Sequence, residues 1–337
     1  MTNLKLAIAA VFLAWPTVAG AAPACGPLKL MNQVQLQRDP ETQRVFIPVS
    51  INGVEKSFLL FLNSWDGVIS PNTVEALNLP TFKGDGFLIS GDKTSHVSEV
   101  SSVEAKIKEI SFGQFRDTDR SLPVRPSMEG VDGYFGFRYL FRFDVDIDFG
   151  NNRLQFFSPE HCEGGVLYWQ APVVGVASLG RIDSLPVVDA SIEGHNLKAV
   201  VSVSTPQTTI TRRVAQSIFG LKLGSLGTEE FGDPNTPDEE KVYQHRFAAL
   251  SLGDLQVKNA LVLIVPDLKV RNFGDQQTTA SRAHSYREEL GYMDMYLGMN
   301  VLSKLHVYLA FAEKHAYFSP AAAVGAPGPT TAPAVSQ

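Results

Sequence analysis

The stretch FLLFLNSWDGVIS, residues 58–70, recurs in pattern as AVVSVSTPQTTIT, residues 199–211. In both, an apolar run leads into a turn of small and polar residues, and Ile followed by Ser or Thr comes next. An Ile-x-Gly triplet precedes each stretch at the same spacing. The chain therefore contains an internal repeat, in which one offset of 141 residues relates Ile51, Gly53, Phe61 and Ile69 to Ile192, Gly194, Ser202 and Ile210.

A second pair of related segments closes each copy. The period is far longer than that of a solenoid, so the repeating unit is a lobe of roughly 130 to 150 residues. The offset grows along the second copy, which predicts an insertion near residues 272–291. Gly136, Leu140, Val145 and Phe149 recur 162 residues later as Gly298, Leu302, Val307 and Phe311, and Phe157-Ser158-Pro159 returns as Phe318-Ser319-Pro320.

The composition indicates a globular protein made mostly of strands. Of 337 residues, 44% are hydrophobic and 19% are charged, and the apolar runs are rich in Val, Ile and Phe. These residues favour strands. The formal net charge is -6 and there is no basic stripe, so we expect neither nucleic acid nor an anionic membrane as a partner.

Residues 1–21 have the order of a secretory signal peptide. Lys5 is followed by an apolar run over residues 6–13 and then by Ala19-Gly20-Ala21. The apolar run is too short to span a membrane. We expect cleavage after Ala21, with Ala22 and Ala24 as alternatives, and a periplasmic or secreted protein.

Cys25 and Cys162 are the only cysteines, and they flank the first copy of the repeat. Export to an oxidising compartment favours a disulfide between them; two unpaired buried thiols are the alternative. A lipid anchor on Cys25 is less well supported, because Ala22-Pro23-Ala24 lacks the Leu that a lipoprotein signal usually carries. Residues 321–337 contain Ala, Pro, Gly and Thr without charge or periodicity, and are expected to be a disordered tail.

Turn and capping signals divide each copy into similar short elements. Asn52-Gly53 between apolar runs predicts a hairpin. Ser70 followed by Pro71 predicts the start of a helix. The expected strands are residues 45–50, 57–62, 103–110, 185–192 and 197–203, and the expected helices are residues 71–79 and 212–219.

Gly84 and Gly86 flank Asp85 in a Gly-rich segment, residues 84–95. It lacks the following helix and the Gly-Lys-Ser/Thr of a phosphate loop, so we expect the mobile tip of a hairpin. The seven histidines and two cysteines lack metal-ligand spacing, and Ser64 and Ser204 have no nearby histidine in the sequence. We therefore expect no metal, no cofactor and no serine hydrolase triad.

The order of these motifs over residues 40–320 resembles the retropepsin-like and pepsin-like aspartic proteases, and most closely their bacterial, exported, two-lobed members. Asp132-Gly133-Tyr134-Phe135-Gly136 and Asp294-Met295-Tyr296-Leu297-Gly298 look like the second signature of that family. The resemblance implies a mostly β, bilobal fold of two tandem retropepsin-like lobes with short helices. We expect the lobes to comprise residues 22–165 and 166–320, in a monomer.

In that family each lobe supplies one Asp-Thr-Gly turn, and the two carboxylates share a proton so that one acts as base and the other as acid. The corresponding residues here are Phe61-Leu62-Asn63 and Ser202-Val203-Ser204, so neither Asp is present. Asp66 lies five residues past the Asp position, too far to replace it, and the counterparts of Asp132 and Asp294 in the family are structural.

The sequence thus predicts an exported, non-catalytic protein that binds an extended peptide or a protein partner in the cleft between its lobes. One alternative is an active aspartic-type peptidase that uses non-standard carboxylates. Another is a structural envelope module whose cleft is closed. The expected floor of the cleft is Phe61, Leu62, Asn63, Ser64, Ser202, Val203, Ser204 and Thr205, and the expected lid contains Gly84 and Gly86.

Overall fold

The computed structural model describes residues 25–321, except for 63–66, 85–86, 90–96, 100–101, 126–129, 137–139, 141, 183–184 and 268–292. The expected signal segment, the insertion near 272–291 and the tail beyond Ala321 lie outside the described residues. The same is true of Asn63, Ser64, Asp66 and Gly86.

The described part of the chain is mostly β, as predicted, and its larger sheet has 13 strands. The first three strands in its order come from the first copy of the repeat, and the other ten come from the second copy. In order across the sheet, the strands are β1 (Leu30–Gln35), β13 (Arg153–Phe157), β12 (Asp144–Asp148), β22 (Leu305–Ala310), β23 (His315–Pro320), β14 (Gly175–Ile182), β15 (Leu185–Ile192), β16 (His195–Val201), β21 (Met295–Leu297), β17 (Thr209–Thr211), β20 (Leu255–Val265), β19 (Val242–Leu252) and β18 (Glu230–Phe231).

The second sheet has eight strands, all from the first copy. β7 (Phe87–Ile89) and β8 (Val97–Glu99) form a separate two-stranded sheet. The eight strands are β10 (Phe115–Pro123), β9 (Ser102–Phe112), β3 (Val45–Ile51), β4 (Val54–Phe61), β11 (Gly133–Gly136) and β5 (Val68–Ile69), with β2 (Gln37–Arg38) beside β3 and β6 (Thr81–Gly84) beside β9.

The predicted hairpin at Asn52-Gly53 is confirmed, and the second copy repeats it at Glu193-Gly194. Asn52 and Gly53 have φ of 51° and 85°, and their counterparts have 48° and 85°. Consecutive positive φ values are those of the two-residue turns that match the twist of paired strands. The strand predicted over 197–203 is β16, which ends at Val201, because the next residues belong to the turn.

Three short helices lie among the described residues: α1 (Pro71–Ala76), α2 (Arg212–Ser217) and α4 (Met299–Leu302). The Ser70 side chain caps α1 by accepting a hydrogen bond from the Thr73 amide, as its position predicts. The helix ends earlier than the predicted residue 79, because Asn78 has a left-handed φ of 49°. α2 likewise ends before residue 219, ahead of Gly220 at φ 62°. None of the helices in the described ranges is long and apolar enough to cross a membrane.

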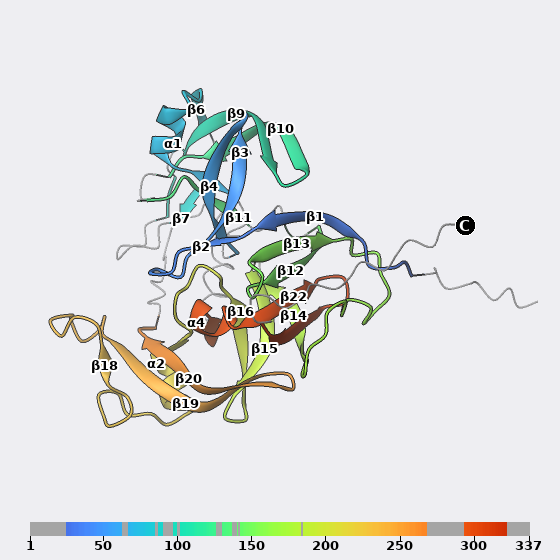
Figure 1. Ribbon diagram of the computed structural model, residues 1–337. Coiled ribbons are helices and arrows are strands. Elements are labelled where there is room, and N and C mark those ends of the chain that lie inside the picture. Colours follow the sequence, from blue (N-terminus) through green and yellow to red (C-terminus); the bar gives the residue numbers. More distant parts are fainter. Residues whose placement is uncertain are drawn as a thin grey trace, which may run out of the picture.

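β12 and β22, the third and fourth strands of the larger sheet, join the two copies by antiparallel pairing. Figure 1 shows them, with β1, β13 and β14, between the blue-to-teal strands of the first copy and the yellow-to-orange strands of the second. Their apolar side chains Val145, Ile147, Val307 and Leu309 are fully buried in the main core, which contains residues from both copies. The two lobes therefore share one continuous core.

The predicted disulfide between Cys25 and Cys162 is present and closes a separation of 137 residues. Two unpaired thiols are thus the wrong alternative, and a Cys25 sulfur in this bond cannot also carry a lipid. The bond fixes the segment of residues 158–169, here termed the strap, which follows β13. The expected lobe boundary between residues 165 and 166 falls within the strap.

Candidate functional site

The two turns named by the repeat have the same strand environment. In the first copy β4 leads into the turn, β5 leaves it, and β11 lies between them, parallel to β4 and antiparallel to β5. β16, β17 and β21 have these roles in the second copy. Phe58 pairs with Gly133, and Ala199 with Met295, so the registers of the two units agree under the offsets of the repeat. Phe61 and Ser202 therefore occupy equivalent positions.

Phe61 is the last residue of β4, where it pairs with Gly136. Its ring is partly buried and stacks on Tyr134 of the same lobe, with 4.9 Å between ring centroids. The next residue, Leu62, is fully buried in the main core. At the turn in the first lobe, an aromatic ring and an aliphatic side chain thus stand where the resemblance implies a carboxylate and a hydroxyl.

Ser202 is fully buried and is held from both sides. Its amide donates to the Leu297 carbonyl at 3.0 Å. Its hydroxyl oxygen lies 2.6 Å from that of Thr205 and 3.5 Å from that of Ser204. The adjacent Val203 is fully buried in the main core, as Leu62 is. The second turn therefore presents a cluster of hydroxyl groups that can exchange hydrogen bonds but do not ionise at ordinary pH.

The signature segment of the second copy, residues 294–298, packs closely against the turn of that copy. A Cβ at Gly298 would lie 2.4 Å from the Gln207 carbonyl carbon and 2.7 Å from the Thr208 nitrogen, so only glycine fits there. The Met299 amide, the first of α4, donates to the Thr205 carbonyl at 2.8 Å. The signature strand and α4 thus hold this turn in place.

Asp132 and Asp294, which the repeat pairs, both bind backbone amides. Asp132 accepts from the Ser57 amide at 2.9 Å and from the Thr73 hydroxyl at 2.9 Å. Asp294 accepts from the Lys198 amide at 3.1 Å, and Lys198 is the counterpart of Ser57 in the repeat. Each carboxylate thus bonds to the strand of its own lobe that leads into the turn. A cavity of about 240 Å³ borders Asp132, and it is lined by Gln37, Pro48, Glu55, Lys56, Ser57 and Asp132.

The expected lid region contains a hairpin. β6 pairs antiparallel with β9, and β7 pairs antiparallel with β8. Gly84 lies in β6 opposite Ser102 and does not have a left-handed φ. Gly84 is therefore part of a paired strand in the expected lid. Gly86 lies outside the described residues.

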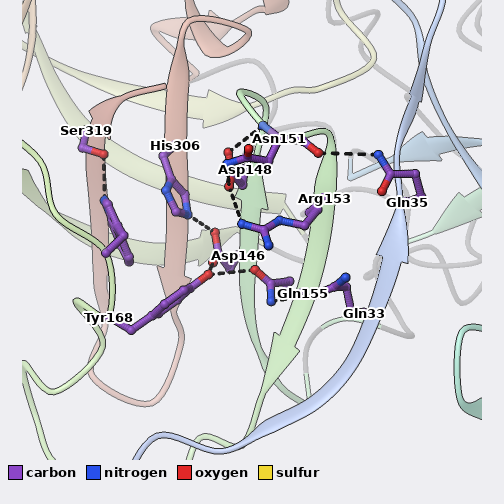
Figure 2. A network of polar contacts seen from close by, with 11 residues as sticks. Gln33, Gln35, Asp146, Asp148, Asn151, Arg153, Gln155, Tyr168, His306 and Ser319 are labelled. Atoms are coloured by element: carbon purple, nitrogen blue, oxygen red, sulfur yellow. Dashed lines mark hydrogen bonds and ion pairs between the residues drawn. The ribbon is translucent and has the colours of Figure 1, made fainter. Parts of the chain in front are cut away.

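The sequence analysis missed a buried polar network at the junction of the lobes (Figure 2). Its centre is Asp146 of β12, whose carboxylate lies 2.5 Å from His306 Nε2 of β22 and accepts from the Tyr168 hydroxyl. The Trp169 ring stacks on His306 at 4.1 Å between centroids. The signal in the sequence was Asp144-Val145-Asp146-Ile147-Asp148, in which three acids alternate with apolar residues in a strand that is buried throughout.

The protonation of this network follows from its contacts. Burial opposes the ionisation of Asp148, but hydrogen bonds from Asn151 and Arg153 and the charge of His306 outweigh it and lower the pKa of Asp148. Burial, together with the charge of Asp146, raises the pKa of the Tyr168 hydroxyl. The tyrosine therefore stays protonated and donates its hydrogen bond. The network links β12, β13, β22 and the strap by hydrogen bonds.

Comparison with solved structures identifies the fold. The aspartic proteinase from Irpex lacteus matches 87% of this chain and 98% of its own, with a TM-score of 0.52 and 12% sequence identity. Conglutin gamma, a basic 7S globulin from lupine seeds, matches 87% of this chain and 95% of its own, with a TM-score of 0.46 and 11% identity. A retropepsin-like aspartic protease from Rickettsia conorii matches 39% of this chain and 93% of its own, with a TM-score of 0.29 and 12% identity.

The similarity to the Irpex lacteus enzyme extends over both copies of the repeat. The chain therefore has the two-lobed aspartic-protease fold that its motifs predict. At this level of identity the likeness concerns the fold alone. No protein-family profile matches the sequence, and no curated protein matches it either.

Proposed function

We propose that this chain is an exported, non-catalytic protein with an aspartic-protease fold, which binds an extended peptide or a segment of a protein partner between its lobes. The observation that carries the proposal is the common register of the two turn units. It makes Phe61 and Ser202 equivalent, and these are the positions at which the resemblance implies the two catalytic Asp residues.

The chemistry of those two residues supports the loss of catalysis. Aspartic proteases need two carboxylates that share one proton. A phenyl ring exchanges no proton, and the Ser202 hydroxyl is engaged with Thr205. Asp132 and Asp294, the acids paired by the repeat, bind amides of their own lobes, which supports structural roles for them. An active peptidase with non-standard carboxylates is for these reasons the weaker alternative.

Several retained features support binding. Phe46, Phe61 and Tyr134 form a partly buried aromatic group beside the first turn. Aromatic side chains of this kind combine large contact area with little loss of conformational entropy. The hairpin of β6–β9 with β7–β8 is retained in the first lobe. Extended peptides bind to such proteins by pairing with strand backbone, which does not require catalytic groups.

Export is part of the proposal and rests on two observations. The first 21 residues have the pattern of a signal peptide. The Cys25–Cys162 disulfide begins four residues after the expected cleavage point, and disulfides persist in oxidising compartments. We therefore propose a periplasmic or secreted monomer.

Binding is tested with an immobilised library of random decapeptides and the purified mature chain. Phe61→Ala should weaken capture of the selected peptides by about tenfold, because it removes an aromatic contact of roughly 1.4 kcal/mol. Phe231→Ala is the matched control, since Phe231 is 44% exposed on the edge strand β18 of the other lobe. Hydrogen exchange should show protection of the 84–95 hairpin when a selected peptide is added.

The structural-module alternative predicts a different outcome. If no peptide is captured and the 84–95 amides exchange fast under all conditions, binding in the cleft is refuted and a closed structural module remains. Specific cleavage of a captured peptide would instead support the alternative of an active peptidase.

A further inference from the structure

The strap, residues 158–169, contacts strands from both lobes. Cys162 ties it to Cys25. Tyr168 donates to Asp146 of β12, and the Trp169 indole donates to the Ser319 hydroxyl of β23 at 2.9 Å. The Gly164 amide donates at 2.9 Å to Glu313, which lies in the turn between β22 and β23. The strap is therefore bonded to β12 of the first copy, and to β23 and the turn between β22 and β23 of the second copy.

His161 is the one residue of the strap with charged partners from both copies among its described contacts. Its Nε2 lies 2.5 Å from a carboxylate oxygen of Asp144 in β12. Its Nδ1 lies 3.1 Å from the Cys162 carbonyl and 3.3 Å from a carboxylate oxygen of Glu313. The His161 side chain is only 1% exposed, and those of Asp144 and Glu313 are 0% and 5% exposed. Water therefore cannot easily replace any of these partners.

Both ring nitrogens of His161 face oxygen atoms that act as hydrogen-bond acceptors. A neutral imidazole has one N–H and one lone pair, so one of its nitrogens would face an acceptor without a proton between them. Only the imidazolium form donates in both directions. Its positive charge also separates two buried carboxylates, which would otherwise repel each other at low dielectric.

We propose that His161, as a buried imidazolium, is a pH-sensitive clasp that fixes the position of the two lobes relative to each other. When it loses its proton, Asp144 and Glu313 are left with a single N–H between them. One of the two bonds is then lost, the strap loosens, and the lobes gain freedom to move. The clasp does not depend on the proposed peptide binding.

The groups around the clasp support this assignment. The Phe311 amide of the second copy donates to Asp144 at 2.9 Å, and the Tyr317 hydroxyl donates to Glu313 at 2.6 Å. Burial raises the pKa of Tyr317, so it remains a donor in alkaline solution. The other titratable groups named around the clasp are acids: Glu163 in the strap, Asp146 in β12 and the uncharged phenol of Tyr308 in β22. Among these described groups, His161 is thus the cation that balances Asp144 and Glu313.

The direction of the pH dependence follows from the pKa of His161. Burial opposes its charge, but the hydrogen bonds to Asp144 and Cys162 and the charges of Asp144 and Glu313 outweigh burial and raise this pKa above 6.5. The folded protein therefore keeps the proton to a higher pH than the unfolded chain. The stabilisation is complete below the ordinary value and is lost as the pH rises through the raised pKa. Burial also raises the pKa of Asp144, against the lowering effect of His161, so the ionised Asp144 that the clasp requires is lost only when the pH falls through that raised pKa.

The test compares the disulfide-bonded mature chain with its His161→Gln variant between about pH 6 and pH 9. The wild-type Tm should fall by about 2 to 4 °C more than that of the variant, whose glutamine does not titrate. His195→Gln, at an exposed histidine, is the control and should follow the wild type. Exchange of the Phe311 and Gly164 amides, corrected for its intrinsic pH dependence, should rise about tenfold in the wild type, with β20 amides as reference.

Two results would overturn the clasp. One is a parallel fall of Tm in wild type and His161→Gln. The other is a neutral imidazole for His161 at about pH 6.5 in ¹⁵N NMR, because the geometry then would not require the cation. If His161→Gln does not fold, Glu313→Gln is used instead. That variant keeps the imidazole but removes one carboxylate, so the titration midpoint of His161 should move to lower pH, and an unchanged midpoint refutes the proposal.

Discussion

Asp146 and Tyr308 are direct cross-strand partners in β12 and β22, and they are 162 residues apart, the offset that relates the closing segments of the repeat. The offset therefore converts one member of this pair into the other. It also exchanges the neighbouring pairs, Val145 with Leu309 and Ile147 with Val307. An approximate two-fold axis thus passes between Asp146 and Tyr308, and the two copies meet there in a register that their sequences encode.

The first prediction concerns catalysis. The purified mature chain should not cleave unfolded protein substrates between about pH 3 and pH 7, because the carboxylate pair that shares a proton is absent from both turns. Restoring Asp at both positions, as Phe61→Asp with Ser202→Asp, should not create activity, since Leu62 and Val203 still differ from the family turns. Pepstatin-sensitive cleavage by protein freed of trace proteases would contradict this prediction.

The second prediction concerns the disulfide. Intact mass before and after alkylation should show no free thiol in the exported protein. Replacing Cys25 and Cys162 by Ser should lower the free energy of unfolding by about 2 to 5 kcal/mol, because the bond closes a long loop in the unfolded chain. Urea unfolding measures this loss. Two alkylated thiols in the non-reduced protein, or a diacylglycerol adduct on Cys25, would count against the bond.

The third prediction compares two acids that the repeat makes equivalent. Asp132→Asn should lower the free energy of unfolding by about 1 to 3 kcal/mol, because Asp132 binds the Ser57 amide and the Thr73 hydroxyl and lies 3.6 Å from Lys56 Nζ. Asp294→Asn should have a smaller effect, since the contact described for Asp294 is a single hydrogen bond from the Lys198 amide. Urea unfolding at neutral pH measures both. Equal effects would mean that the hydrogen bond from Thr73 and the ion pair with Lys56 add no stability.

The fourth prediction tests how closely the two turns approach each other. Leu62 and Val203 are both fully buried in the main core, one from each turn. Leu62→Ala and Val203→Ala should each destabilise the chain, and if the side chains meet at the lobe junction, the double mutant should show a coupling of about 0.5 to 3 kcal/mol. Chemical unfolding of the four proteins gives this value. Strictly additive losses of stability would mean that Leu62 and Val203 do not touch. The two turns, and with them Phe61 and Ser202, would then lie apart.

The sequence determined the features that depend on local or periodic signals. The Asn52-Gly53 turn was predictable because its residues tolerate left-handed φ, and the start of α1 because Ser70 can cap it. The equivalence of Phe61 and Ser202 followed from one constant offset, which the strand registers reproduce. The same signals occur in both copies because each copy forms the same strands around its own turn.

Tertiary structure alone decided the polar junction. Asp146 and His306 are 160 residues apart, and no local signal indicates that they meet. The contact exists because pairing of β12 with β22 places both side chains on the face of the sheet that the strap covers. His161 gains its two carboxylate partners in the same way, from strands that are distant in the chain. Charges separated so widely in the sequence become neighbours only when the two lobes pack together and exclude water from between them.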